Sequence, residues 1–300
     1  MYKFTPILKT LVWGTESWVL SGVPGSESVV AEGPEAGKMI TDLYPGQFPL
    51  LIKFIDAKRD LSIQVHPDNE LAAKRHGCSG KTEMWYVIGA EPGAKLISGL
   101  KEPITPDDYV RLVEQDRITD VLAEHAVAPG DVFFLPSGRI HAIGGGCYLA
   151  EIQQTSDITY RIYDYNRPGL DGKPRQLHTQ EAKDAIDYHV YPEYRTLYEP
   201  RQNEPVELVR CPYFTTTLYD LTQRPEIPDQ VGDDDKTSFA GLTGESPFLI
   251  AIGLFGSGTV KTEQDEKKLS PGEAVLIPAA EGEISFIPAA SGWKFLTTHP

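Results

Sequence analysis

Short apolar runs recur along the chain and are bounded by Gly, Pro and Asp. The clearest runs span residues 50–55 (LLIKFI), 85–88 (WYVI), 131–135 (DVFFL), 248–254 (FLIAIGL) and 274–277 (AVLI). Apolar runs of this length, separated by frequent turn residues, are typical of strands in a sandwich or a barrel. The pattern therefore predicts an all-β fold.

Three segments carry helical patterns instead. Residues 67–76 offer Asp68 as an N-cap, and residues 179–188 offer Thr179 in the same role. Residues 105–124 contain two short helical patterns, DDYVRLVEQ and ITDVLAEH. We expect a few short helices, including a helical insertion near residues 105–124.

A boundary between two domains is predicted near residue 190, where residues 188–205 are polar and contain proline. A weak repeat supports two similar halves, because residues 130–136 (GDVFFLP) and 272–278 (GEAVLIP) share a Gly, five residues and a Pro. The repeat predicts two jelly-roll barrels, residues 1–190 and 191–300. Chance similarity between two turn–strand units is the alternative.

Composition narrows the possible partners. The chain of 300 residues has 28 Lys+Arg against 43 Asp+Glu, a formal net charge of -15. This charge disfavours binding to nucleic acid or to an anionic membrane surface, since both depend on cationic contacts. No run approaches the roughly 18 apolar residues of a membrane helix, and no signal peptide is evident.

The three cysteines, Cys78, Cys147 and Cys211, show no CxxC spacing. A disulfide framework or a cysteine-ligated metal is therefore not expected. The combined features predict a cytoplasmic protein, and they leave its oligomeric state open.

The chemistry concentrates around one short strand. Gln64 and His66 are two residues apart, so they share a face of that strand with Ser62. Glu83 begins another apolar strand, and His141 follows a third. A lone strand histidine is more often simply hydrogen-bonded. Taken together, Gln64, His66, Glu83 and His141 form a mixed nitrogen and oxygen set that suits a divalent ion, zinc above all.

These motifs resemble known sequences. The pattern Gly130-x5-Pro136-x-Gly138-x2-His141 resembles the second motif of the cupin superfamily. Gln64-Val-His66 followed by Glu83 resembles the variant first motif of the class I mannose-6-phosphate isomerases. Further matching segments span roughly residues 10–180; they are VWG (12–14), LSIQVHPD (61–68), KTEMWYV (81–87), EIQQTSDITYR (151–161) and YDYNR (163–167).

The resemblance implies an aldose–ketose isomerase that interconverts mannose 6-phosphate and fructose 6-phosphate by proton transfer through a cis-enediol. It implies one zinc or other divalent ion per chain, held by Gln64, His66, Glu83 and His141. The small-molecule partner would be a sugar phosphate. The length is similar to the short bacterial form of this family.

The resemblance also implies catalytic roles. Arg161 matches the family's active-site arginine, with a surface salt bridge as the alternative, and Lys81 matches its active-site lysine, with a solvated surface position as the alternative. Glu151 and Asp157 match acidic residues that line the pocket. Either carboxylate could relay a proton or orient Arg161.

Three further residues match substrate-binding positions. Ser62 and Arg167 correspond to positions near the phosphate, and Arg167 has a structural pair with Asp164 as its alternative. Trp13 is expected to wall the sugar pocket, or to belong to the core as aromatic residues usually do.

The chain departs from the pattern in places. Gly145 stands where many cupins have Asn, and the second copy carries Ala280 and Glu283 at the glycine and histidine positions. We therefore expect the second barrel to be metal-free. Two other functions remain open: a non-catalytic sugar- or metal-binding cupin, and another cupin enzyme such as a dioxygenase. Proton-transfer groups argue against the first, and Gln64 in place of a histidine argues against the second.

Overall fold

The computed structural model describes residues 1–222, 237–239 and 246–300, and these form two compact units. The first, called here the site unit, comprises Ile7–Ser26 and Gly46–Thr196. The second, called here the C-terminal unit, comprises Met1–Pro6, Glu27–Pro45 and Leu197–Pro300. Two short N-terminal segments therefore belong with the later part of the chain. The division into domains at residues 190 and 191 stays a prediction.

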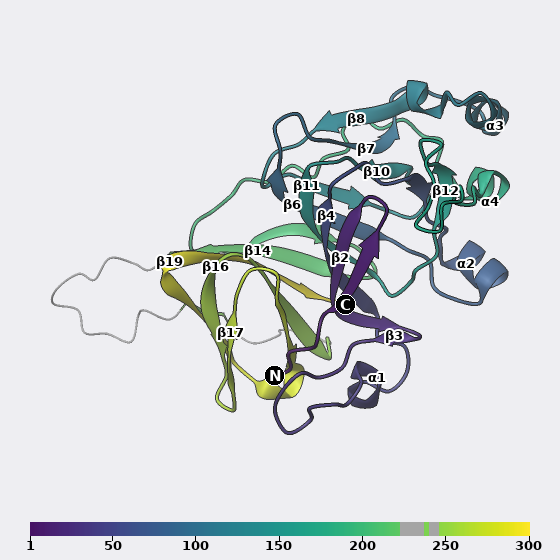
Figure 1. The fold of residues 1–300 in the computed structure, drawn as a ribbon. Helices are drawn as coiled ribbons and strands as arrows, with labels where there is room; N and C mark the ends of the chain where they lie inside the picture. The colour runs from purple at the N-terminus through teal and green to yellow at the C-terminus, as the bar shows by residue number, and fades with distance from the viewer. Residues whose placement is uncertain (223–236, 240–245) are drawn as a thin grey trace. The chain divides into compact units, whose positions relative to one another are not determined.

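One sheet of the site unit runs in the order β1-β2-β4-β11-β6-β9, with every neighbouring pair antiparallel (Figure 1). Its central strands are apolar along most of their length and almost wholly buried, as expected for strands covered on both faces. The strands are β1 (Ile7–Leu11), β2 (Gly14–Val23), β4 (Leu50–Ala57), β6 (Glu83–Ala90), β9 (Val132–Leu135) and β11 (Cys147–Gln154); the short β3 (Ser26–Glu27) follows β2.

A second sheet of the site unit runs in the order β12-β5-β10-β7-β8. One face of this sheet packs against the helices through a core that includes Ile63, Val65, Tyr109 and Ala182. Figure 1 shows α3 and α4 beside these strands. The elements are β5 (Ile63–Val65), α2 (Asn69–His76), β7 (Lys95–Leu100), α3 (Pro106–Glu114), η1 (Ile118–Val121), β8 (Leu122–Ala126), β10 (His141–Ile143), β12 (Tyr160–Tyr163) and α4 (Thr179–Ala185).

The C-terminal unit contains a sheet in the order β13-β14-β19-β16-β17, with β15 on β19 and β18 on β16. Its core is rich in aromatic rings, and Tyr219 stacks on Phe295 with ring centroids 4.9 Å apart. The elements are α1 (Ile40–Leu43), β13 (Val206–Arg210), β14 (Thr215–Leu221), β15 (Thr237–Phe239), β16 (Phe248–Lys261), β17 (Glu266–Leu269), β18 (Ala274–Pro278), η2 (Ala279–Glu281) and β19 (Ile284–His299).

The structure confirms a mainly β fold with a few helices, and each apolar run named above contributes a strand. The N-cap of α2 is Asp68 as predicted, since its carboxylate accepts a hydrogen bond of 2.8 Å from the Leu71 amide. No helix in the described ranges is long and apolar enough to cross a membrane.

Two helix predictions were wrong. The N-cap of α4 is His178, and Thr179 is the first helical residue. The second pattern within residues 105–124 forms only the short η1 before the chain enters β8. Pairing of β8 along β7 supplies backbone hydrogen bonds that outweigh a weak helical preference.

Candidate metal centre and active site

A polar row crosses the second sheet of the site unit. Gln64 on β5 lies directly opposite Arg161 on β12 and opposite His141 on β10, and His141 lies opposite Ser98 on β7. Directly opposed residues of antiparallel strands point to the same face. The fold therefore places the predicted ligand Gln64 between His141 and Arg161 on one face of the sheet.

A second polar row crosses the first sheet. Lys53 on β4 lies opposite Glu151 on β11, and Glu151 lies opposite Trp85 on β6. Glu83 precedes Trp85 by two residues and so shares its face. Charged residues inside buried strands are costly unless they pair, so this row indicates a built site.

Three of the four predicted metal ligands converge. Ligand atoms of His66, Glu83 and His141 lie within 4.8 Å of one another, and all three residues are buried. The fourth, Gln64, donates a hydrogen bond of 3.3 Å from Nε2 to His141 Nε2. Because the oxygen belongs to the same amide, Gln64 is within reach of the cluster as a fourth ligand.

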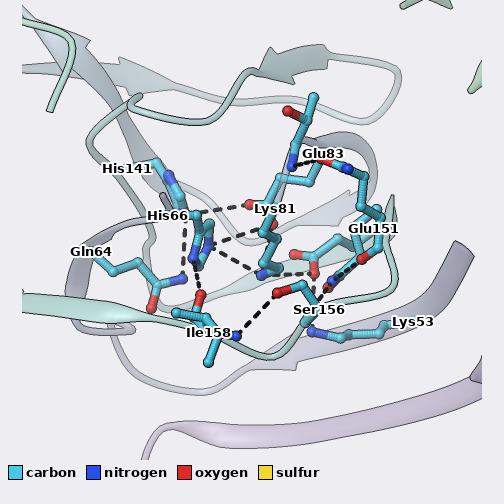
Figure 2. A network of polar contacts seen from close by, with 12 residues as sticks. Lys53, Gln64, His66, Lys81, Glu83, His141, Glu151, Ser156 and Ile158 are labelled. Atoms are coloured by element: carbon cyan, nitrogen blue, oxygen red, sulfur yellow. Dashed lines mark hydrogen bonds and ion pairs between the residues drawn. The ribbon is translucent and has the colours of Figure 1, made fainter. Parts of the chain in front are cut away.

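Backbone carbonyls orient both imidazoles. His66 Nδ1 donates to the Ile158 carbonyl (Figure 2), and His141 Nδ1 donates to the Arg139 carbonyl, each at 2.8 Å. Protonation at Nδ1 leaves the Nε2 lone pairs facing the cluster, which is the arrangement of metal-ligating histidines. Burial, reinforced by the charge of Lys81, lowers the pKa of His141 to about 3 and that of His66 well below its usual value. Both rings are thus neutral.

The carboxylate oxygens of Glu83 face the unprotonated Nε2 atoms of the two histidines, so hydrogen-bond acceptors lie opposite one another. Its Oε1 lies 3.3 Å from His141 Nε2, and its Oε2 lies 3.6 Å from His66 Nε2. Burial, together with the nearby Glu151 carboxylate, raises the pKa of Glu83 to about 7. The Lys81 ammonium lies 2.8 Å from Glu83 Oε2 and 3.1 Å from His66 Nε2, so positive charge is already accommodated here. The converging lone pairs fit a divalent cation.

The pKa of Glu83 leads to a prediction about metal binding. In the metal-free protein below pH 7 the Glu83 carboxyl carries a proton, which a metal ion must displace, whereas His66 and His141 carry none on Nε2. Metal affinity should fall roughly tenfold per unit as pH drops from about 7 to about 5, and level off above about 7. Titration with zinc across this pH range measures it. The same slope in Glu83→Gln would contradict the assignment.

Next to the cluster lies a buried chain of charges. Lys81 Nζ is 3.7 Å from Glu151 Oε1, and Lys53 Nζ is 3.1 Å from the same oxygen. Trp85 Nε1 donates to the other Glu151 oxygen at 2.9 Å. Burial alone would raise the pKa of Glu151, but the two lysines and Trp85 together lower it to about 2. Glu151 is therefore a fixed anion that holds two lysines in place.

Lys53 is a buried residue of the site that was not predicted from the sequence; it is 4% exposed and also lies 3.9 Å from Glu16. Its signal is a lysine in the middle of the apolar run LLIKFI of residues 50–55. A charge at the centre of a strand that is buried on both faces requires a buried partner. Sequence alone does not show that this partner is Glu151.

Lys53→Met should be strongly destabilising, because it leaves Glu151 buried with one cation fewer. The free energy of unfolding should fall by about 3–5 kcal/mol, the usual cost of breaking a buried pair. Lys58→Met is the matched control, since Lys58 is 67% exposed and pairs with Asp56 at the surface. The control should change by less than about 1 kcal/mol. Equal effects in urea denaturation would contradict the buried role of Lys53.

Arg161 lies on β12 opposite Gln64, and Asp157 precedes it by four residues. Arg161 Nη1 donates to the Gln176 carbonyl at 2.9 Å, and its buried Nε has no hydrogen-bond partner among the described residues. Burial, together with the charges of Arg175 and Arg167, lowers the pKa of Arg161. Asp157 is exposed, and within the described ranges no hydrogen bond or ion pair joins it to Arg161. The orienting role of Asp157 stays a prediction.

The expected substrate residues differ in setting. Ser62 is buried just before β5. Arg167 donates to Asp164 at 2.9 and 3.1 Å, which is the structural pair considered as its alternative, and Arg175 binds the same carboxylate. Trp13 is 4% exposed and belongs to a hydrophobic core. Its core position favours a structural role for this ring.

The chain is similar in sequence to known proteins. Residues 15–85 match the family model for the catalytic domain of type I phosphomannose isomerase. The mannose-6-phosphate isomerase ManA of Bacillus subtilis is 31% identical over 93% of this chain and 93% of its own length. A mannose-6-phosphate isomerase of Streptococcus mutans is 31% identical over 88% of this chain and 82% of its own length.

Solved structures show the same fold. The crystal structure of mannose 6-phosphate isomerase from Bacillus subtilis matches all of this chain and 99% of its own, with a TM-score of 0.84 and 29% identity. A zinc-bound mannose 6-phosphate isomerase matches 99% of this chain and 98% of its own, with a TM-score of 0.73 and 15% identity. Taken with the sequence relatives, these likenesses mean that the chain belongs to the mannose-6-phosphate isomerase family.

Proposed function

We propose that this chain interconverts mannose 6-phosphate and fructose 6-phosphate, moving a proton between C2 and C1 through a cis-enediol. The observation that carries the proposal is the buried cluster of His66, Glu83 and His141, with Lys81 against it and Glu151 behind. A site built only to bind a sugar needs no such set of proton-carrying groups. Family membership supports the same reaction.

The metal proposed at this cluster is zinc, held by Gln64, His66, Glu83 and His141. The mixed nitrogen and oxygen donors suit zinc, and the related structure described as zinc-bound supports this choice. When bound, the ion supplies Lewis-acid polarisation of the sugar oxygens. Glu83 offers the only ligand charge of the four, so the centre keeps a net positive charge that favours an enediolate.

Lys81 is the proposed proton-handling group, and Glu151, as a fixed anion, is proposed to hold it in position. Lys81 touches both the cluster and Glu151, which places its amine beside the proposed metal site as the acid or base. Arg161, on the face it shares with Gln64, would donate hydrogen bonds to the enediolate or to the phosphate. Asp157 is proposed as a pocket carboxylate at the exposed side.

The proposed phosphate site lies with Arg161 and Arg167, with Ser62 as a hydroxyl donor. Arg161, Arg167 and Arg175 surround the single carboxylate of Asp164, which leaves a local excess of positive charge in an acidic protein. A dianionic phosphate is stabilised by such an excess. Trp13 would contribute to substrate binding only indirectly, through the core that it joins.

For the fold we propose two cupin-type jelly rolls, residues 1–190 and 191–300, of which the second is metal-free. Two observations support the first jelly roll. The strands of the site unit form two antiparallel sheets, and the proposed ligands come from both of them, Gln64 and His141 from one and Glu83 from the other. Within the described part of the C-terminal unit, no group of His, Cys, Asp and Glu gathers as a metal set. Three free cysteines support a cytoplasmic location.

A coupled assay of fructose 6-phosphate formation from mannose 6-phosphate tests the function. Activity should be lost on treatment with a chelator and return on addition of zinc. Activity that survives thorough metal removal would overturn the metal role. Binding of the sugar phosphate without turnover would favour the alternative of a non-catalytic cupin.

A further inference from the structure

The orientation of His141 depends on one backbone carbonyl. His141 Nδ1 donates to the carbonyl of Arg139, two residues earlier, at 2.8 Å. The same loop reaches the other histidine ligand, because the Gly138 amide donates to the His66 carbonyl at 2.9 Å. Residues 138–140 therefore contact both the imidazole of His141 and the backbone of His66, which directly follows β5.

The side chain of Arg139 is held by two aromatic rings. Its guanidinium carbon lies 4.6 Å from the ring centroid of Tyr191 and 4.7 Å from that of Tyr194. Arg139 is 7% exposed, and burial lowers the pKa of its guanidinium. A desolvated cation over aromatic faces is attracted more strongly than an exposed one. The two tyrosines thus fix the residue whose carbonyl orients His141.

These tyrosines belong to a segment that is itself anchored. Tyr194 donates its hydroxyl to the Leu100 carbonyl at 2.6 Å and accepts from the Tyr191 amide at 3.1 Å. Its ring fits against Gly99, where a Cβ atom would lie 2.1 Å from Tyr194 Cε1. Tyr191 donates to Asp187, whose own amide donates to the Gly138 carbonyl at 2.8 Å.

We propose that residues 187–196, named here the tyrosine strap, fix the geometry of the metal centre, and that Arg139 is its positioning residue. The two tyrosine rings of the strap hold the side chain of Arg139, and the Asp187 amide binds the Gly138 carbonyl. Together these contacts keep residues 138–140 in place, so that His141 Nε2 points toward the cluster. The inference rests on the metal site of the proposed function. The proposal assigns a structural role to residues that the sequence pattern predicts to be a linker between two domains.

Zinc affinity of the full-length protein, measured by competition with a chromophoric chelator, tests the strap directly. Arg139→Met keeps the carbonyl that orients His141 but removes the side chain that anchors it, so zinc binding should weaken by about 10-fold, the lower end of the effect of losing an orienting partner. Arg139→Lys should recover most of the affinity, because an ammonium also binds aromatic faces. Tyr191→Leu should weaken binding as well, and Tyr191→Phe, which keeps the ring but loses the hydrogen bond to Asp187, should weaken it less than Tyr191→Leu.

Arg195→Met is the matched control. Arg195 lies in the same strap with its guanidinium carbon 5.6 Å from the ring of Phe133, but it pairs with Asp131 and the Ala126 carbonyl. An equal loss of affinity in this control would overturn the specific role of Arg139. So would zinc affinity within twofold of wild type in Arg139→Met.

The outcomes separate this inference from the proposed function. If wild-type protein binds zinc and isomerises the sugar phosphate while Arg139→Met binds equally well, only the strap fails. If wild-type protein binds no zinc, the metal centre and the strap fail together. Because Tyr191 is 40% exposed, Tyr191→Leu should still fold, and its zinc affinity tests the proposal if Arg139→Met does not fold.

Discussion

Replacing His141 with alanine should abolish metal binding and lower turnover by at least about 1,000-fold. A Lewis-acid ion contributes several kcal/mol to stabilising the charge that develops in the reaction, and each 1.4 kcal/mol corresponds to about tenfold in rate. His141 lies at the centre of the donor set: its Nε2 is 3.3 Å from both Glu83 and the Gln64 amide. Metal content after dialysis and the rate of fructose 6-phosphate formation are the measurements.

The matched control is His76→Ala. His76 is an exposed residue that ends α2 and contacts the Tyr160 hydroxyl at 2.8 Å. It should retain one metal ion per chain and near wild-type turnover. Full metal occupancy in His141→Ala would show that the ligand assignment is wrong. Lost occupancy with normal turnover would show that the metal is not needed for the reaction.

Arg161→Ala should lower turnover by at least about 100-fold while metal content stays unchanged. Arg161 shares a sheet face with Gln64 but is not one of the grouped residues His66, Glu83 and His141, and its buried Nε has no hydrogen-bond partner in the described ranges. A buried guanidinium N–H without an acceptor costs stability, and an anionic sugar phosphate would supply the missing acceptor. Steady-state kinetics measures the loss of turnover, and metal analysis of the same variant measures its metal content.

Two variants sharpen the test of Arg161. Arg161→Lys keeps the charge without the planar fork, so it should recover only part of the turnover. Arg75→Ala removes an arginine of α2 that pairs with Asp184 at the surface, and should leave turnover unchanged. Full activity in Arg161→Ala would remove this residue from the chemistry. Loss of metal in that variant would assign it a structural role instead.

Much of the site follows from local sequence. The two-residue spacing of Gln64 and His66 on a strand predicts a shared direction, and the motif match predicts that Glu83 and His141 join them. The cluster of His66, Glu83 and His141 confirms that these three meet. Local spacing works here because each ligand lies on or beside a short strand whose faces alternate.

The remaining parts depend on contacts between distant segments. Lys53 and Glu151 are separated by almost a hundred residues and pair only because β4 and β11 are neighbours. Arg139 depends on Tyr191 and Tyr194, which come fifty residues later. A pattern read along the chain cannot state which strand lies beside which. For the same reason the sequence left two interpretations of the aromatic Trp13, a wall of the pocket or, as is more usual for such residues, part of the core.

The tyrosine strap changes where this protein can be divided. A fragment that ends at residue 190, the boundary suggested by composition, would lack Tyr191 and Tyr194 and expose the groove beside Gly99. A fragment that ends at Thr196 keeps both rings, and Thr196 still donates to the Val132 carbonyl at 2.8 Å. Moving the end of the fragment by six residues therefore decides whether it retains the two tyrosines that hold Arg139 beside His141. Chimaeras within this family should be joined after Thr196 and not at residue 190.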